Sequence, residues 1–303
     1  MPADMLPTYT PYDGSSKPFS IGLLQLEPER WIEPDGELAE QVLLKRRLVA
    51  EHGEHVLRAE PGTQEAQQEA LDLLTEYLPQ HHPEHYSLND ARMAVAGVDT
   101  DIVDETMTPL HRAGLLVQDD LVIMRKGENG WRIAAAFLAF PSSWRLSEKF
   151  GLPMDEVHAP VPSFEGGSRN AGLINRMFDN LSADRIVVRW NWSVNWSHAL
   201  YHPNAASEEE KHAVPPEKAV IRVERQTLRK LPVSGDILFT IRIYLDPVSA
   251  ILAQPNAADL AVSMADQLEA MSDAEVAYKG LTEKRAELVG LLRQKEAVNT
   301  LAG

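Results

Sequence analysis

The chain contains no cysteine among its 303 residues. Disulfide bonds, zinc fingers, iron–sulfur clusters, thiolate-ligated haem and cysteine nucleophiles all need a sulfur atom that this sequence lacks. Any metal must therefore be bound by His, Asp, Glu, Tyr, Lys or Met side chains. The absence also fits a reducing compartment.

Basic residues are fewer than acidic residues in this chain. The 29 lysines and arginines face 45 aspartates and glutamates, which gives a formal net charge of −16. An electrostatic field of that sign repels phosphate backbones and anionic lipid, so we expect neither nucleic-acid binding nor membrane docking. It favours a cationic substrate or a basic partner protein instead.

Targeting segments and common catalytic motifs are also missing. No run of about 18 apolar residues occurs, and Met1–Thr10 lacks the basic-then-apolar pattern of a signal peptide, so we expect a cytoplasmic location. The phosphate-binding patterns G-x-x-x-x-G-K and G-x-G-x-x-G, the nucleophile elbow G-x-S-x-G and the zinc motif H-E-x-x-H are absent. The histidines at 81, 82 and 85 surround Pro83, and this tract is interpreted as a surface loop rather than a metal site.

The pattern of apolar residues predicts helices near both ends. Leucines and valines recur at helical spacing from Leu38 to Val49, Gly53 is a suitable stop, and Thr63 is a suitable cap for a second helix. We predict a helical extension over residues 1–115. Residues 253–303 are predicted as C-terminal helices, with a break where Ser272 and Glu275 form a capping box.

The middle of the chain, residues 116–252, is predicted to form strands around two helices. Alternating apolar and polar residues indicate strands, and the turn residues 126–130 indicate a hairpin. This order favours the α+β class with an antiparallel sheet. The predicted elements are a hairpin of Leu121–Arg125 and Arg132–Phe140, helices in Ser142–Phe150 and Ser168–Leu181, and strands in Arg185–Trp196, Val220–Leu228 and Asp236–Leu245.

One histidine stands out among the candidate ligands. His158 lies between apolar residues just after a predicted helix, and the prolines that follow it restrict the backbone. Neutral imidazole is the common haem ligand where thiolate is unavailable. The alternative is a buried, hydrogen-bonded core histidine. His198, at the end of a predicted strand, is a second candidate ligand.

Three arginines lie on adjacent predicted strands near several tryptophans. Arg189, Arg222 and Arg225 present forked donors that suit carboxylates such as haem propionates. Cross-strand ion pairs with neighbours such as Glu224 are the alternative. Trp192 belongs to a tryptophan stripe that is either core or the wall of a cofactor site.

Several ordered motifs together resemble the haem-dependent oxidative N-demethylase family, in its haem-binding catalytic subunit. The resemblance covers roughly residues 21–252 and is strongest from residue 140 to 244. Its motifs are FPSSWRLSEK at 140–149, HAPVP at 158–162, RWNW at 189–192, RVERQTLRKLP at 222–232 and FTIRIY at 239–244.

The resemblance implies a PAS-like fold in which helices and an antiparallel sheet enclose haem b. It implies oxidative removal of a methyl group from a small secondary amine, such as dimethylamine, with O₂. Electrons from NAD(P)H would arrive through reductase subunits that carry FMN and an iron–sulfur cluster. The released carbon would leave as formaldehyde or pass to a folate-binding subunit.

The resemblance also assigns roles to residues. His158 becomes the favoured axial ligand of the iron, with Arg189, Arg222, Arg225 and Trp192 around the haem. No motif of the resemblance marks a substrate site, and Glu224 and Tyr201 are the candidate catalytic residues near the substrate. The alternative function is a haem-PAS sensor or binding module that reports O₂ or redox state without catalysis.

Overall fold

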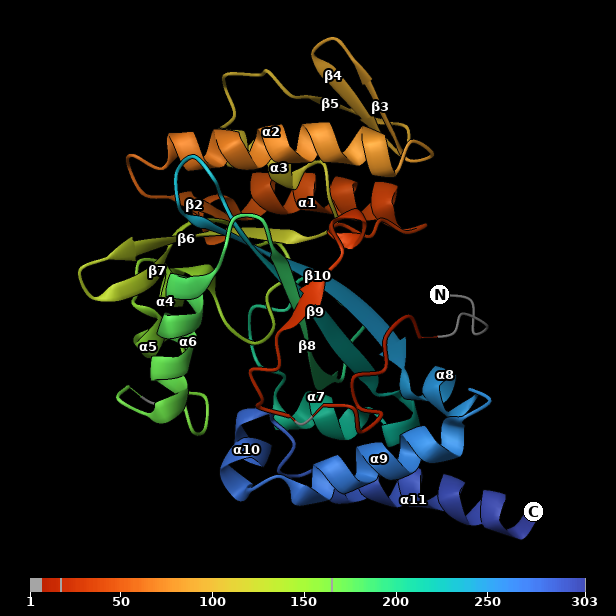
Figure 1. Ribbon diagram of the computed structural model, residues 1–303. Coiled ribbons are helices and arrows are strands. Elements are labelled where there is room, and N and C mark those ends of the chain that lie inside the picture. Colours follow the sequence, from red (N-terminus) through yellow and green to blue (C-terminus); the bar gives the residue numbers. More distant parts are fainter. Residues whose placement is uncertain (1–6, 17, 165, 303) are drawn as a thin grey trace.

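A seven-stranded antiparallel sheet forms the centre of the molecule (Figure 1). The computed structural model describes residues 7–16, 18–164 and 166–302. Helices and antiparallel strands together confirm the predicted α+β class. In order across the sheet, the strands are β1 (Leu24–Leu26), β8 (Ile186–Asn195), β9 (Val220–Lys230), β10 (Ile237–Pro247), β6 (Asp120–Gly127), β7 (Gly130–Phe137) and β2 (Leu57–Ala59).

The predicted hairpin and the three long strands are confirmed. β6 and β7 pair from Leu121 opposite Phe137 to Gly127 opposite Gly130. Gly130 has a φ of 101°, a left-handed conformation that glycine adopts without a steric penalty. β9 pairs with β8 on one side and with β10 on the other. The five strands β6–β10 therefore form one continuous surface.

The N-terminal helices cover one face of this sheet. α1 (Leu38–His52) ends at Gly53, as predicted, and α2 (Gln64–His81) begins after Thr63. The Thr63 hydroxyl donates to the Glu60 carbonyl at 2.7 Å instead of capping the helix. α3 (Pro109–Gly114) packs against α2, and both contribute to a large apolar core with β6 and β7.

The N-terminal region also contains strands that the sequence analysis did not predict. Its short strands β1 and β2 pair with β8 and β7, so this region contributes both edges of the central sheet. A separate three-stranded sheet lies beyond α2 in Figure 1. Its strands are β3 (Tyr86–Asn89), β4 (Arg92–Val95) and β5 (Val98–Asp101).

Short helices lie over the opposite face of β6 and β7. α4 (Leu146–Lys149), α5 (Met154–Val157) and α6 (Arg169–Asn180) share a second apolar cluster with these strands. α4 and α6 lie within the two predicted helical ranges, Ser142–Phe150 and Ser168–Leu181, whereas α5 was not predicted. The layer between these helices and the sheet contains the candidate site described below.

The C-terminal helices pack below the sheet, as Figure 1 shows in blue. α9 (Ala257–Ala270), α10 (Asp273–Tyr278) and α11 (Arg285–Ala302) follow the predicted helical region. The predicted capping box before α10 is confirmed, because Ser272 and Glu275 bond reciprocally. The connecting helices are η1 (Pro28–Arg30), η2 (Gly53–His55), α7 (Glu208–Ala213), η3 (Pro216–Lys218) and α8 (Val248–Leu252).

Candidate functional site

A cavity of about 510 Å³ lies between the sheet and helices α4–α6. This volume falls in the range of roughly 300–1,000 Å³ typical of small-molecule and cofactor pockets. One part of its wall is apolar and comes from the hairpin, α5, α6 and β10. The apolar lining includes Val122, Met124, Ile133, Met154, Val157, Phe164, Ile174, Phe178, Leu228 and Phe239.

The polar part of the wall comes from β8 and β9. Side chains alternate between the two faces of a strand, so every second residue of β8 faces the cavity. These residues are Arg189, Asn191, Ser193 and Asn195. The register places Arg189 opposite Gln226, Asn191 opposite Glu224 and Ser193 opposite Arg222.

Glu224 is a largely buried carboxylate at the centre of this polar wall, with 15% of its side chain exposed. It accepts hydrogen bonds from Asn191 at 3.3 Å, Gln226 at 2.9 Å and Arg222 at 3.4 Å. Burial alone would raise the pKa of Glu224. The Arg222 charge and the three hydrogen bonds outweigh burial and lower the pKa, so the carboxylate is ionised at neutral pH.

Arg189 and Arg222 are both cationic residues with unused donors. Arg222 donates to the Phe140 carbonyl at 2.5 Å, and Arg189 donates to the Ser20 carbonyl at 3.1 Å. Arg222 Nη1 and Arg189 Nε are buried and have no hydrogen-bond partner among the described residues. Burial lowers the pKa of both guanidinium groups, but Arg remains protonated. The wall therefore has more donors than its own acceptors satisfy.

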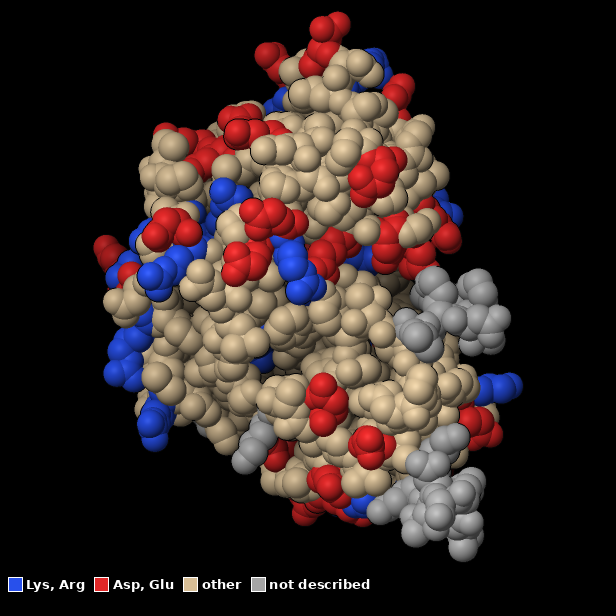
Figure 2. All heavy atoms as spheres, turned by 45° about the vertical axis from the view of Figure 1, so that its right-hand side comes forward, with Lys and Arg blue, Asp and Glu red and all other residues tan. Residues whose placement is uncertain are grey.

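Two lysines that the sequence analysis missed also line the cavity. The Lys149 ammonium lies 4.4 Å from the centre of the Trp144 ring. The Lys279 ammonium donates to the Trp192 carbonyl at 2.6 Å. Burial lowers the pKa of both lysines, that of Lys279 to about 8. The cavity is rich in cations, although acidic side chains are spread over much of the surface seen in Figure 2.

His158 lies on the helical side of the cavity, immediately after α5. Its Nδ1 lies 3.0 Å from the Met154 carbonyl oxygen. A carbonyl only accepts, so Nδ1 carries the hydrogen and Nε2 keeps a lone pair. Burial lowers the pKa of the ring, which favours this neutral form. The geometry is the one that metal-binding histidines use, where the second nitrogen bonds to a carbonyl or carboxylate.

The structure therefore brings four of the predicted site residues to one cavity: His158, Arg189, Arg222 and Glu224. The others lie elsewhere. Tyr201 stacks on the His52 ring at 4.6 Å and lines a different, more open hollow with Trp196 and His202. The candidate ligand His198 is exposed to solvent outside the cavity.

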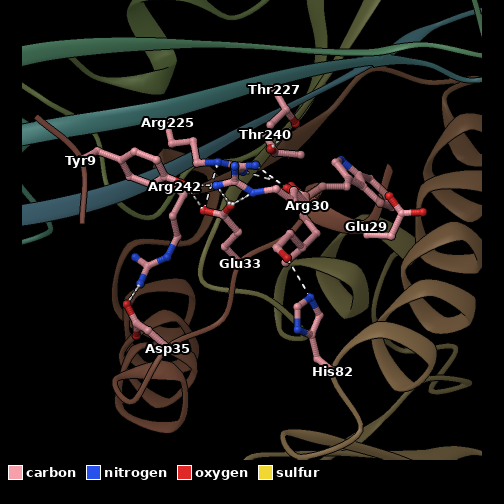
Figure 3. A network of polar contacts seen from close by, with 12 residues as sticks. Tyr9, Glu29, Arg30, Glu33, Asp35, His82, Arg225, Thr227, Thr240 and Arg242 are labelled. Atoms are coloured by element: carbon pink, nitrogen blue, oxygen red, sulfur yellow. Dashed lines mark hydrogen bonds and ion pairs between the residues drawn. The ribbon is translucent and has the colours of Figure 1, made fainter. Parts of the chain in front are cut away.

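Arg225 and Trp192 face the opposite side of the sheet. Arg225 donates to the Trp31 carbonyl at 3.0 Å. It also pairs with Glu33 at 3.3 Å, and both side chains are labelled in Figure 3. Arg242, also labelled there, reaches Asp35 at 2.5 Å. These contacts hold the N-terminal segment on the rear of the sheet. Trp192 packs in the cluster formed with the C-terminal helices.

The histidine tract does not form a metal site. His81 is the last residue of α2, and a ring nitrogen of His82 lies 2.8 Å from the Ile32 carbonyl oxygen. Across the part of the chain that the structure describes, no three His, Cys, Asp or Glu side chains are grouped to hold a metal ion. None of the described helices is long and apolar enough to cross a membrane.

Comparison with protein families gives one match over most of the chain. The matching family model is described as haem-dependent oxidative N-demethylase, alpha subunit-like, and it matches residues 22–289. The matched region contains the cavity-facing residues of β8 and β9, His158 and both lysines. The chain belongs to this haem-dependent oxidative N-demethylase, alpha subunit-like, family.

Proposed function

We propose that this chain binds haem b in the cavity and oxidatively demethylates a small secondary amine such as dimethylamine. The observation that carries the proposal is the pairing of His158 with a cationic wall across one largely apolar cavity. A planar, apolar macrocycle with two carboxylates matches a chamber that has apolar sides and surplus cationic donors. The order of hairpin, helices and three strands on one antiparallel surface supports a PAS-like description of this core.

The residues that we assign to the haem follow from their positions. His158 would bind the iron through Nε2, because Nδ1 is held by the Met154 carbonyl. Arg189 and Arg222 would bind the carboxylates through their unused donors. We leave Arg225 and Trp192 out of this set because they lie on the far face of the sheet.

Glu224 is the residue that we assign to the amine. A dialkylamine is protonated at neutral pH, and an ionised, largely buried carboxylate attracts it strongly. Asn191 and Gln226 hold the Glu224 oxygens in place, so the bound ammonium would have a defined orientation. We do not assign Tyr201 to the substrate, because it lines the other hollow.

When bound, haem supplies the activation of O₂ that oxidises the carbon next to nitrogen. The overall change is balanced: dimethylamine, O₂, two electrons and two protons give methylamine, formaldehyde and water. The chain has no cysteine for an iron–sulfur relay of its own. We therefore propose that the electrons come from NAD(P)H through partner subunits that carry FMN and an iron–sulfur cluster.

The test is to reconstitute the purified chain with haem, reduce it, and supply dimethylamine and O₂. We expect a Soret band and the release of equal amounts of formaldehyde and methylamine. Absence of a Soret band after reconstitution would overturn haem binding. A haem-loaded chain that releases no formaldehyde from any secondary or tertiary methylamine would favour the alternative function, an O₂ or redox sensor.

A further inference from the structure

Lys279 is the point at which the C-terminal helices reach the cavity. It directly follows α10, and its ammonium lies 2.6 Å from the Trp192 carbonyl oxygen and 5.0 Å from the centre of the Phe19 ring. Its neighbours in the chain, Val276 and Leu281, are buried in the apolar cluster beneath the sheet. The lysine is therefore fixed in place by packing on both sides rather than carried on a free loop.

The Lys279 charge has no counter-ion at close range. No carboxylate of a described residue forms an ion pair with it, and its ammonium donates a hydrogen bond to the neutral carbonyl of Trp192. The carboxylates whose charges raise the pKa of Lys279 are those of Glu224 and Glu275. Removing a charge from water without pairing it costs free energy, and burial accordingly lowers the pKa of this amine to about 8.

The whole cavity shares this shortage of negative charge. Among the described residues that line it, Lys149, Arg189, Arg222 and Lys279 are basic, whereas Glu148 and Glu224 are acidic. Glu148 is exposed and accepts a hydrogen bond from the Arg145 backbone. Glu224 is already bonded to Arg222 and two amides. A ligand of this cavity should therefore bring negative charge with it.

We propose that Lys279 binds a carboxylate of the ligand in this cavity, so that the C-terminal helices form part of the cofactor site. The proposal rests on the proposed function, which takes that ligand to be haem. An ammonium has three N–H donors, and the Trp192 carbonyl accepts one of them. Two donors remain for a carboxylate on the cavity side.

Lys279 is better suited to this role than Lys149. Both ammonium groups lie over aromatic rings, Lys149 over Trp144 at 4.4 Å and Lys279 over Phe19 at 5.0 Å and Trp192 at 5.6 Å. The two lysines differ in that, besides burial, the Arg189 charge also acts on Lys279 and lowers its pKa. Arg189 and Lys279 therefore lie near enough to repel each other. One carboxylate bound between them would relieve this repulsion.

The experiment compares haem with haem dimethyl ester, in which both carboxylates are esterified and uncharged. Dissociation constants are measured by titration of the full-length protein, followed by the visible spectrum. The variants are Lys279→Met, Lys279→Arg and, as the matched control, Lys218→Met, at an exposed lysine outside the cavity. Thermal unfolding of each apo-protein reports whether the variant still folds.

We expect Lys279→Met to weaken haem binding about tenfold or more, the usual effect of losing a charge-assisted hydrogen bond. Binding of the ester should change less than about twofold, because the ester has no free carboxylate for Lys279 to bind. Lys279→Arg should retain most of the affinity, and Lys218→Met should leave it nearly unchanged. Apo-Lys279→Met should unfold at or above the wild-type temperature, because an unpaired charge has been removed.

Two results would overturn this inference while leaving the proposed function intact. One is a Lys279→Met protein that binds haem as tightly as wild type. The other is equal weakening of haem and its ester, which would assign Lys279 a purely structural role. Wild-type protein that binds neither ligand would overturn the inference and the proposed function together.

Discussion

The Nδ1 atom of His158 lies 3.0 Å from the backbone oxygen of Met154, four residues earlier in the chain. This contact fixes the tautomer of the ring and leaves Nε2 as the nitrogen with a free lone pair. If His158 is the ligand, it binds the iron through Nε2, and this assignment can be tested directly.

His158→Ala should remove the axial ligand from the iron. We expect the visible spectrum of the haem-loaded protein to change and added imidazole to restore it, because free imidazole can occupy the space of the lost ring. The matched control is His198→Ala, since His198 is exposed outside the cavity. An unchanged spectrum for His158→Ala would reassign the ligand.

Arg189→Met should weaken haem binding by about 1.5–3 kcal/mol, the range of a hydrogen bond to a charged group. Arg225→Met should leave the affinity of the folded protein unchanged, because Arg225 lies on the rear face and bonds to the Trp31 carbonyl. It should instead lower the free energy of unfolding by about 3 kcal/mol, since Glu33 and two backbone carbonyls each lose one cationic partner. Spectroscopic titration and urea unfolding separate the two effects. Haem loss in Arg225→Met at full stability would contradict the placement of the site.

The sequence alone shows that Arg222 and Arg225 lie on opposite faces of the sheet. Arg222 and Arg225 are three residues apart on one strand, so they must point to opposite faces of the sheet. The same alternation groups Arg189 with Asn191, Ser193 and Asn195 on the cavity side. Strand alternation thus predicts which side chains share a face, although it does not tell which face encloses a cavity.

Other features could not be read from local patterns. Strands β3–β5 have four residues each, so they offer too few positions for a period of two to stand out. Lys279 lies close to Phe19, although most of the chain separates the two residues in sequence. Only the packing of the two chain ends against the sheet brings such residues together, and no spacing rule encodes that contact.

Glu224→Gln should impair use of the amine while leaving haem bound. The amide cannot provide the negative charge that attracts a dialkylammonium, so we expect kcat/KM for dimethylamine to fall about tenfold to a hundredfold. The loss should appear chiefly in KM, because the interaction is made in the ground state as well. Formaldehyde release measures it, and Ser193→Ala is a control on the same wall. An unchanged kcat/KM would exclude Glu224 from amine binding.

Lys45→Met should destabilise the N-terminal layer. Lys45 is fully buried and donates to the carbonyls of Gly114, Val117 and Asp119 at 3.1, 3.0 and 2.5 Å. Methionine fills a similar volume but leaves these acceptors unpaired, so we expect a loss of about 3 kcal/mol in the free energy of unfolding. Arg47→Met, on the exposed side of the same helix, should change stability by less than about 0.5 kcal/mol. Equal urea midpoints for the two variants would contradict this role.

Asp246→Asn should stabilise the protein at neutral pH but not in acid. Burial raises the pKa of Asp246 to about 6, and its Oδ2 has no hydrogen-bond partner among the described residues. A raised pKa means that the folded protein holds the proton more tightly than the unfolded chain, whose Asp pKa is about 3.9. This contribution to stability is complete below about pH 4 and is lost as the pH rises to about 6. Above that pH the ionised carboxylate costs about 3 kcal/mol, which the neutral amide avoids.

Urea unfolding at about pH 4 and about pH 8 tests this linkage. The gain of Asp246→Asn over wild type should be near zero at the lower pH and about 3 kcal/mol at the higher one. Asp259→Asn is the matched control, because Asp259 is exposed in the first turn of α9, where its charge favours the helix. It should show no gain at either pH. A gain for Asp246→Asn that is equal at both pH values would mean that packing, not the carboxylate charge, limits stability at this position.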